Sequence, residues 1–354
     1  MKSAFYDGTL SVEVRDIPVP APRPGQILIR TIVSGTNPKD WKDPKYWSPA
    51  DAPPANHGDD IAGYVEALGE GVTGFSPGDR VAAFHEMNTE FGSYAEYSIS
   101  WAHSTFHIPP HVSFEEAATI PLASMTASLA LYQDLNLPLP WNPAKGRLPL
   151  IIYGGSSAVG AFAIKLAVLS NIHPIAAVAG KGGDFTRSLL DESKGDVVID
   201  YRKGHDHVVS ELRKGVGNDA TRAFDAVSEH GSTEAIGEVL GKGGQITTVL
   251  TPEMVVGGRV DSGLSEILFT LVGRVHQDSS SRLTDDPSAL LGDPEFGAVF
   301  FHFVGILLAQ RRFNGHPFEV IDKGLLKGVD TALDLLKAKK LSARKAVIRI
   351  SANE

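Results

Sequence analysis

Hydrophobic and polar positions change their period along this chain. Over roughly the first third, short runs of β-branched and apolar residues alternate with polar ones, as in "GQILIRTIVSGTN", "DIAGYVEALGEGV", "FSPGDRVAAF" and "GSYAEYSIS". Gly and Pro separate these runs, which is typical of strands joined by turns. The pattern predicts a compact β-rich domain.

The period becomes helical from Ser113. In "SFEEAATIPLASMTASLALYQDL" Ser113 is a candidate N-cap, and Glu116 stands at the capping-box position three residues later. The apolar residues beyond it have helical spacing, and Pro121 marks a break. We therefore expect two consecutive helices here.

Strands and helices then alternate. "LPLIIYGG" is a continuous apolar run that ends in glycines, as a fully buried strand does. Strands are expected at 148–155, 173–180, 196–201, 223–229 and 244–250, with helices at 158–171, 185–193, 205–216 and 232–243 between them. This alternation predicts an α/β fold with a doubly wound parallel sheet.

The last third is less regular. "DSSSRLTDDPSALLGDPEFG" (278–297) is expected to be an excursion before a helix at 298–311, and the tail 316–350 is expected to be strand, helix, strand. The strand-like "EILFTLVGRVHQ" (266–277) offers an edge for pairing in a homodimer, with a monomer as the alternative.

Composition narrows the class. A length of 354 residues, 42% hydrophobic and 21% charged, favours a two-domain globular enzyme. No uninterrupted apolar run reaches about 18 residues, which argues against a membrane span. The N-terminus has no apolar stretch of signal-peptide type, so a cytoplasmic location is expected. The net charge of −9 opposes nucleic-acid binding.

The absence of cysteine excludes three kinds of site that depend on a thiol. With Cys 0, the chain has no disulfide, no thiolate ligand for zinc and no cysteine nucleophile.

The strongest local motif is "LIIYGGSSAVGAFAIKLA". A buried strand enters a tight Gly/Ser turn that opens a helix, and a helix N-terminus suits a pyrophosphate. The strict G-x-G-x-x-G spacing is not met, and a plain strand–helix corner is the alternative. The residues expected to bind the dinucleotide are Gly154, Gly155, Ser156, Ser157, Ala158, Val159 and Gly160.

The residues after the next strand bear on whether the cofactor is NADPH or NAD. Lys181 follows it directly and favours the 2′-phosphate of NADPH, whereas Asp184 keeps NAD open. The alternative for Lys181 is a solvated loop lysine. Tyr201 and Arg202, after the third strand, form a possible adenosine-side platform.

The whole chain resembles the medium-chain dehydrogenase/reductase superfamily, in its zinc-independent quinone-oxidoreductase-like branch. The similarity is carried by "SGTNPKDWK", "HGDDIAGYVEALGEGV", "GFSPGDRV", "AATIPLASMTA", "YGGSSAVG", "VIDYR" and "KKLSARKAVIRI". Fungal trans-acting enoyl reductases and toxin-cluster oxidoreductases are the nearest set. The resemblance implies a GroES-like catalytic domain at 1–122 and 312–354, and a Rossmann NADP(H)-binding domain at 123–311.

The resemblance also bears on whether the protein binds a metal ion. Zinc members of the superfamily carry Gly-His-Glu where this chain has Gly58, Asp59 and Asp60, and their first ligand is a cysteine that is absent here. His57 is one residue off the ligand position, so a packing role is expected for it. No metal is expected.

Further site residues are implied by matched motifs. "NP-x-D-x-K" lies along the nicotinamide side in the relatives, which implies cofactor contacts for Asn37, Lys39 and Asp40, and phosphate binding or enolate stabilisation for Lys42. An exposed helix-start lysine is the alternative for Lys42.

Three other segments are implicated in the same way. Thr126 matches a threonine near the nicotinamide, with a helix hydroxyl bonded to its own backbone as the alternative. Tyr94 is a proton-donor candidate at a strand position that is usually structural. The remaining segment is expected to contact the nicotinamide amide through its backbone, and it consists of Val249, Leu250 and Thr251.

These observations lead to one functional expectation with alternatives. We expect a zinc-independent, NADPH-dependent reductase of a carbonyl-conjugated C=C bond in fungal secondary metabolism. Its substrate would be a small molecule or an acyl chain on a carrier, with a polyketide synthase as a possible partner. The alternatives are a quinone oxidoreductase, a non-catalytic NADPH-binding protein and a member recruited to a non-redox reaction such as a cyclisation.

Overall fold

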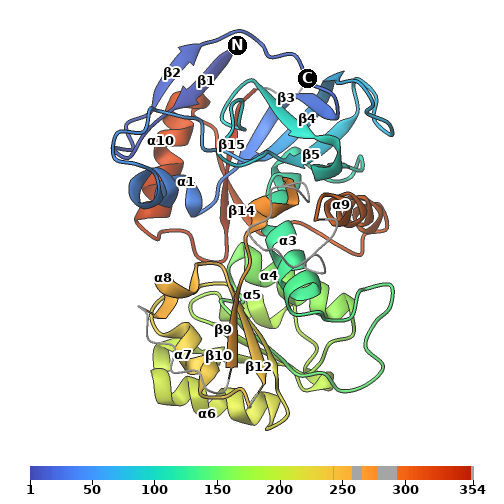
Figure 1. The fold of residues 1–354 in the computed structure, drawn as a ribbon, viewed down its shortest axis with the longest axis vertical. Coiled ribbons are helices and arrows are strands. Elements are labelled where there is room, and N and C mark those ends of the chain that lie inside the picture. Colours follow the sequence, from blue (N-terminus) through green and yellow to red (C-terminus); the bar gives the residue numbers. More distant parts are fainter. Residues whose placement is uncertain (242, 257–264, 277–292, 352–354) are drawn as a thin grey trace, which may run out of the picture. The chain divides into compact units, whose positions relative to one another are not determined.

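The computed structural model describes residues 1–241, 243–256, 265–276 and 293–351. They form two compact units. The first combines Met1–Leu122 with Gly273–Glu354, and the second is Ala123–Val272. The first unit therefore joins the two ends of the chain, blue and red in Figure 1, and the second is the green-to-yellow middle.

The first unit is built on a bent β-sheet. Its strand order is β14-β15-β3-β4-β5-β7, with β6 paired to β3, and β1 and β2 form a separate antiparallel pair. The strands are β1 (Lys2–Phe5), β2 (Glu13–Asp16), β3 (Gln26–Gly35), β4 (Asp60–Leu68), β5 (Arg80–Phe84), β6 (Tyr97–Trp101), β7 (Thr105–His107), β14 (Phe318–Ile321) and β15 (Lys345–Arg349). The expected β-rich domain is confirmed.

The long strand β3 positions the residues that follow it. Its register against β4 shifts twice, between Leu28 and Ile29 and between Thr31 and Val33, and such bulges bend a strand. It ends at Gly35, where a Cβ atom would lie 2.1 Å from the carbonyl oxygen of Ala118. Only glycine fits there, so β3 can pass directly beneath the chain at residue 118.

Helices of different lengths follow or cover these strands. They are α1 (Lys39–Lys42), η1 (Asp43–Trp47), η2 (Ala102–Ser104), α2 (Phe114–Ala117), η6 (Val272–His276), α9 (Asp293–Ala309) and α10 (Gly324–Lys337). Ser113 caps α2, because its side chain accepts a hydrogen bond from the backbone N–H of Glu116. α10 buries Val329, Ala332 and Leu333 in a cluster that also contains Ala346 and Ile348 of β15.

Helix α9 corrects the expected domain boundary. We expected the chain to return to the first domain at residue 312, but the described residues from Gly273 onward already belong to the first unit. Phe301 of α9 packs against Phe106 of β7, with ring centroids 5.3 Å apart, and His111 lies 3.1 Å from the carbonyl oxygen of Leu308. The apolar face of α9 therefore completes the core of the first unit. Most of the 278–297 excursion lies outside the described residues.

The second unit is a doubly wound parallel sheet. Its order is β10-β9-β8-β11-β12-β13, and neighbouring strands of this described sheet all run parallel. The strands are β8 (Leu150–Tyr153), β9 (Ile175–Ala179), β10 (Val197–Asp200), β11 (Arg222–Asp225), β12 (Gly244–Thr248) and β13 (Ser265–Phe269). This is the Rossmann order, so the predicted α/β fold is confirmed.

Helices connect the strands of the second unit. They are α3 (Pro121–Ser128), η3 (Leu129–Asp134), α4 (Ala158–Leu169), α5 (Gly183–Arg187), η4 (Glu192–Lys194), η5 (Tyr201–Lys203), α6 (His205–Val216), α7 (Ser232–Gly237) and α8 (Pro252–Val256). The helix expected at 185–193 is shorter than predicted and is divided between α5 and η4. β13 is the outer strand of the described sheet, which places part of "EILFTLVGRVHQ" at an edge.

Candidate functional site

The loop after β8 has the geometry of a phosphate-binding turn. Gly154 has φ of +84°, and Ser157 caps α4 by accepting a hydrogen bond from the N–H of Gly160 at 3.0 Å. A Cβ atom would lie 2.9 Å from the Thr186 side chain at Gly155 and 2.3 Å from the carbonyl oxygen of Gly154 at Gly160. Glycine is therefore favoured by backbone conformation at Gly154 and required by packing at Gly155 and Gly160, and α4 begins with its N–H groups at the carboxyl edge of the sheet.

A cavity of about 340 Å³ lies beside the ends of β9 and β10. Gly180 and Lys181 line it, and a Cβ atom at Gly180 would lie 2.6 Å from the ring of Tyr201. The ring of Tyr201 is half exposed and covers the backbone at Gly180. The charged residues that line the cavity are Lys181, Asp184, Arg187, Asp200, Arg202, Lys203, His207 and Glu211.

Two of its cations are paired with neighbouring acids. Arg202 donates to Asp200 at 2.6 Å, and this bond holds the pKa of Asp200 down at about 2. Arg187 donates to Asp184 at 3.1 Å. Among the described residues, Lys181 makes neither a hydrogen bond nor an ion pair through its side chain. The cavity thus offers an uncommitted ammonium beside the expected adenosine position.

The carboxyl ends of β11 and β12 are fixed by Asp225. This buried carboxylate accepts hydrogen bonds from the hydroxyls of Ser232 at 2.6 Å and Thr233 at 2.7 Å, and from the backbone N–H of Ser228 at 2.8 Å. Ser228 in turn accepts a bond from the N–H of Val249 at 3.0 Å. One backbone donor expected to face the nicotinamide is therefore already engaged.

Leu250 and Thr251 continue the turn after β12. The carbonyl oxygen of Leu250 accepts a bond from the Thr248 hydroxyl at 2.7 Å, and the carbonyl of Thr251 accepts one from the N–H of Met254 at 3.0 Å. Thr126 lies on α3 in the same unit and is 5% exposed. The structure therefore brings the glycine loop, Lys181, Tyr201 and the turn after β12 to one edge of one sheet.

The first unit contains a buried network of charges around α1. Asp40 is fully buried, and its Oδ2 accepts bonds from the hydroxyl of Tyr94 at 2.6 Å and from the backbone N–H of Asn37 at 2.7 Å. Tyr6 donates to the carbonyl oxygen of Asp40 at 3.0 Å. These bonds fix the start of α1, the helix that ends at Lys42.

Lys39 joins Asp40 to the segment before β4. Its Nζ lies 2.6 Å from Oδ2 of Asp59 and 3.4 Å from Oδ1 of Asp40, and it donates to the carbonyl oxygen of His57 at 2.7 Å. The ring of His57 packs against the ring of Tyr6 at 4.9 Å. The expected packing role of His57 is consistent with this placement.

A second buried pair extends the network. Oδ2 of Asp60 accepts bonds from Nδ2 of Asn37 at 2.7 Å and from Nζ of Lys345 at 2.5 Å. Oδ1 of Asp60 accepts the backbone N–H of Leu122 at 2.7 Å, and Lys345 also donates to Oδ1 of Asn37 at 3.0 Å. Asn37, Asp60 and Lys345 are all buried, so the pair is closed to solvent.

Burial and charge set the protonation of this network. Burial raises the pKa of Asp59 to about 6 against the opposing effect of Lys39, and it raises the pKa of Asp40 to about 6 in the same way. Burial alone would lower the pKa of Lys39, but Asp59 and Asp40 outweigh it and raise the value. Burial and then the nearby Lys39 charge lower the pKa of His57 to about 4, so its ring is neutral at pH 7.

The positions of several predicted site residues bear on whether their roles are structural or catalytic. Tyr94 is fully buried, with its hydroxyl committed to Asp40, which favours the structural alternative over a proton donor. Asn37 and Asp40 are also buried, and both hydrogen-bond inside the network. Lys42 is half-buried at the end of α1 and has a partner among its surroundings.

The pattern of the sequence did not single out Asp60 and Lys345 as partners. A lysine inside the apolar run "RKAVIRI" and an aspartate that begins "DIAGYV" are the only signals, because each places a charge in a strand that is otherwise buried.

The described residues provide neither a metal-ligand cluster nor a membrane-spanning helix. No set of three or more His, Asp or Glu side chains is arranged there to hold a metal ion. No described helix has both the length and the apolar character needed to cross a membrane.

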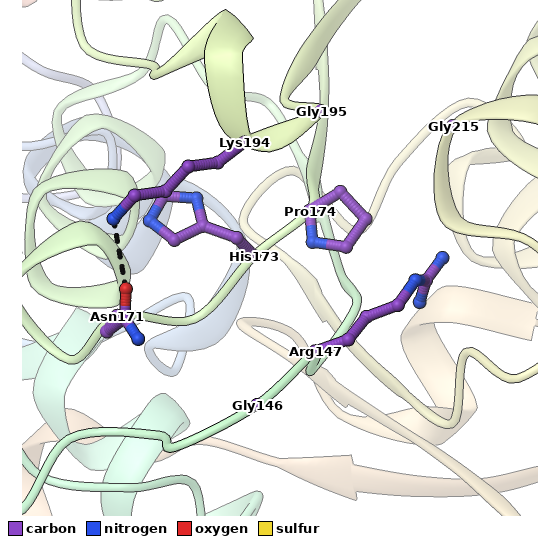
Figure 2. Close-up of a pocket in the computed structure, with 8 residues that line it drawn as sticks. All are labelled: Gly146, Arg147, Asn171, His173, Pro174, Lys194, Gly195 and Gly215. Atoms are coloured by element: carbon purple, nitrogen blue, oxygen red, sulfur yellow. Dashed lines mark hydrogen bonds between the residues drawn. The ribbon is translucent and has the colours of Figure 1, made fainter.

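A second cavity, of about 550 Å³, lies at the other edge of the second unit's sheet. Figure 2 shows its lining residues, which precede β8, β9 and β10 rather than follow them. Lys194 donates to Asn171 at 2.9 Å, as Figure 2 shows. Nδ1 of His173 lies 2.8 Å from Asp196. Ligands of doubly wound folds bind at the carboxyl ends of the strands, so this cavity is separate from the nucleotide edge.

Comparisons with known proteins agree with this arrangement. Residues 23–110 match the model of the alcohol dehydrogenase GroES-like domain. The chain is 40% identical over 325 residues to trans-enoyl reductase fsr4 of Gibberella fujikuroi, covering 91% of this chain and 90% of that protein. It is 33% identical over 361 residues to trans-enoyl reductase resD of Aspergillus sclerotiorum, covering 95% and 96%.

Solved structures share the fold. The mycobacterial protein Rv1454c, in complex with NADPH, superposes with a TM-score of 0.73 at 18% identity, covering 99% of this chain and all of that one.

Proposed function

Because the chain belongs to the trans-enoyl reductases of the medium-chain dehydrogenase/reductase superfamily, and is therefore an oxidoreductase, we propose that it delivers hydride from NADPH to a carbonyl-conjugated C=C bond. The observation that carries this proposal is its likeness to two fungal enzymes of that name over more than nine-tenths of its length. The intact phosphate turn at Gly154–Gly160 supports the use of a dinucleotide.

The choice of NADPH over NADH rests on the cavity beside β9. Lys181 follows the strand and lines the cavity, with no acid committed to it among the described residues. A 2′-phosphate brings negative charge to this position and would gain a charge-assisted hydrogen bond from the ammonium. Arg187 and Arg202 are held by Asp184 and Asp200. Lys203 also lines the cavity, but Lys181 closely follows β9, the strand whose end carries the residue that distinguishes the two cofactors.

The chain's own residues then orient the reaction. Bound NADPH supplies the hydride. The glycine loop holds its pyrophosphate, and the backbone of Val249, Leu250 and Thr251, together with Thr126, holds the nicotinamide end. Lys42 stabilises the negative charge that develops on the substrate's carbonyl oxygen as hydride adds, and the enolate formed then takes a proton from solvent to give the saturated product. Asn37, Lys39, Asp40 and Tyr94 position α1 and through it Lys42, without contacting the cofactor.

We also propose that the reaction is independent of zinc. The chain has no cysteine, and Asp59, which stands where zinc members carry a ligand histidine, is bound to the ammonium of Lys39. A conjugated double bond is already activated by its carbonyl group, so hydride attack needs an oriented C4 and a hydrogen bond to the oxygen rather than a Lewis acid.

The names of the relatives, trans-enoyl reductases, support a proposal for the substrate class. We propose an enoyl thioester, presented on a carrier protein of a fungal polyketide synthase, as the physiological substrate. A trans-acting enzyme works on chains held by another protein, so the pantetheine thioester is the shared chemical unit.

One assay tests the proposal. Purified protein is mixed with NADPH or NADH and with an enoyl pantetheine thioester, an enal or a quinone, and the loss of reduced nicotinamide absorbance is followed. We expect turnover of the thioester with NADPH and little with quinones. Turnover of quinones alone would establish the quinone oxidoreductase alternative, and NADPH binding without oxidation of any acceptor would refute both activities.

A further inference from the structure

Strand β11 lies between the two strands that lead into the proposed cofactor-binding turns. The order β8-β11-β12 places it there. Asp225, its last residue, is in register with Tyr153 of β8 and with Thr248 of β12. Tyr153 immediately precedes the glycine loop, and Thr248 immediately precedes the turn at 249–251. One residue of β11 is therefore level with the start of both turns.

The carboxylate of Asp225 organises the segment that joins β11 to α7. The side chain is fully buried. Its Oδ1 accepts the backbone N–H groups of Val227 at 3.0 Å and of Ser228 at 2.8 Å. Its Oδ2 accepts the hydroxyls of Ser232 at 2.6 Å and of Thr233 at 2.7 Å. Because a buried carboxylate is costly without hydrogen-bond donors, the segment is held close to the end of β11.

Val227 connects this segment to the glycine loop. The backbone N–H of Ala226 donates to the carbonyl oxygen of Tyr153 at 3.0 Å. A Cβ atom at Gly154 would lie 2.5 Å from Cγ2 of Val227, so the valine side chain packs directly against the backbone of Gly154. The start of the glycine loop is therefore in contact with a residue whose N–H is bound by Asp225.

Ser228 connects the same segment to the turn after β12. Its hydroxyl oxygen accepts the backbone N–H of Val249 at 3.0 Å, and the hydroxyl donates to the carbonyl oxygen of Asp225 at 2.9 Å. The φ angle of Ser228 is +56°, a left-handed conformation that costs free energy in a residue other than glycine. The bond from its N–H to the Asp225 carboxylate helps to offset this cost, so Asp225 holds in place the hydroxyl that binds Val249.

We propose that Asp225 is a positioning residue for the cofactor. Through Val227 and Ser228 it sets the glycine loop and the turn at 249–251 relative to each other, and it thereby fixes the spacing between the pyrophosphate site and the nicotinamide site. The carboxylate does this without contacting the cofactor. The inference rests on the proposed function for the assignment of the two turns to the two ends of NADPH.

A purely structural role makes a different prediction. If Asp225 only satisfies buried donors, substitutions around it lower the stability and leave the cofactor affinity of the folded protein unchanged. If it positions the two turns, loss of the bond to Val249 weakens binding of the whole dinucleotide. Binding of adenosine 2′,5′-bisphosphate should not change, because this ligand carries the adenosine end and has neither the pyrophosphate nor the nicotinamide.

The experiment is calorimetric titration of folded, full-length variants with NADPH and with adenosine 2′,5′-bisphosphate. Ser228→Ala should raise the dissociation constant for NADPH about tenfold and leave that for the bisphosphate unchanged. Ser170→Ala is the matched control, because it removes a buried hydroxyl that bonds Tyr132 at 3.0 Å at the C-terminal end of α4, away from both turns. It should change neither constant.

A double variant tests whether Asp225 acts through Ser228. Asp225→Asn should also weaken NADPH binding, and adding Ser228→Ala to it should cost less than Ser228→Ala costs in the unsubstituted protein. If Asp225→Asn folds poorly, Ser228→Ala and Ser170→Ala decide the question by themselves.

Three outcomes would overturn the proposal. They are unchanged NADPH affinity in Ser228→Ala, equal weakening of NADPH and of the bisphosphate, and fully additive losses in the double variant. The readout is binding rather than turnover. NADPH binding without reduction of any enoyl substrate would therefore refute the proposed reaction and leave this test in force, whereas an unsubstituted protein that does not bind NADPH would refute both.

Discussion

Lys345 donates from Nζ to Oδ2 of Asp60, although 285 residues separate the two in the sequence. Lys345 is 4% exposed and Asp60 is fully buried, and Asn37 bonds to both. The pair connects β15, near the end of the chain, to β4 near its beginning. A buried ion pair of this kind matters most to stability because the loss of one partner would leave the other charge buried and uncompensated.

Lys345→Met should therefore be strongly destabilising. It leaves the Asp60 carboxylate buried without its cation, which costs roughly 3–5 kcal/mol of unfolding free energy. Urea denaturation of the variant measures this loss. Lys214→Met is the matched control, because Lys214 pairs with Glu211 on the surface at 69% side-chain exposure, and its effect should stay within about 1 kcal/mol. Equal losses in the two variants would contradict the prediction.

The stability of the protein should depend on pH through His103. Burial lowers the pKa of His103 to about 4, so the folded state keeps this ring neutral where the unfolded chain binds a proton. Its stabilising contribution is fully present above about pH 6.5 and is lost as the pH falls toward about 4.

His103→Phe should reduce this dependence by about 2 kcal/mol between pH 7 and about pH 5. Urea denaturation at the two pH values gives the difference. His302→Phe changes an exposed histidine of α9 and should leave the dependence as it is. A parallel shift of both variants would show that another group is responsible.

Gly160→Ala should abolish dinucleotide binding. Its Cβ would lie 2.3 Å from the carbonyl oxygen of Gly154, so the loop must open and the N-terminus of α4 must move. Fluorescence titration with NADPH measures the loss. Gly237→Ala is the matched control in α7, where nothing lies within 4 Å of the added atom; it should keep binding and gain up to about 1 kcal/mol of stability. Wild-type affinity in Gly160→Ala would remove the loop from the nucleotide site.

Lys181→Ala should separate the two cofactors. We expect the dissociation constant for NADPH to rise about tenfold or more, because a charge-assisted bond to the 2′-phosphate is lost, while NADH binding stays unchanged. Calorimetric titration with each cofactor checks this. Lys194→Ala, at the other cavity of the same unit, should change neither constant. An equal weakening of both cofactors by Lys181→Ala would refute the 2′-phosphate assignment.

Tyr94→Phe distinguishes a proton donor from a structural tyrosine. The substitution removes the 2.6 Å bond to Asp40 and should cost roughly 1.5–3 kcal/mol of stability, since the acceptor is a buried carboxylate. Turnover per folded molecule should be retained, because the hydroxyl has no exposure. A large fall in kcat at unchanged stability would identify Tyr94 as a catalytic residue.

The sequence predicted the nucleotide-binding unit well because its signals are local. "LPLIIYGG" is apolar throughout and ends in glycines, and the strand β8 and the turn at Gly154 form where this run predicts them. Ser157 acts as the N-cap of α4 in this unit, and in the first unit Ser113 caps α2, as its spacing to Glu116 predicts. Hydrophobic period and capping chemistry depend on neighbours within a few residues, so they can be read without the fold.

The boundary at residue 312 failed for the opposite reason. The helix was expected at 298–311, and α9 does cover most of that segment, but its partner surface on β7 and η2 is encoded almost two hundred residues earlier. The sequence of an apolar helix indicates that the helix is buried, but it does not indicate which surface the helix packs against. The pairing of Lys345 with Asp60 was missed for the same reason.

The two-part composition of the first unit also fixes the order in which it can be completed during synthesis. The six strands that the structure describes in the second unit are all translated before residue 273, so these strands exist while the rest of the chain is still being synthesised. The first unit cannot complete its sheet until β15 has been synthesised. Until Lys345 leaves the ribosome, Asp60 and Asn37 lack the cation that their burial requires, and β3 and β4 remain a sheet with an open edge. The nascent chain therefore contains the described strands of the second unit before β15 and Lys345, which the first unit requires, have been synthesised.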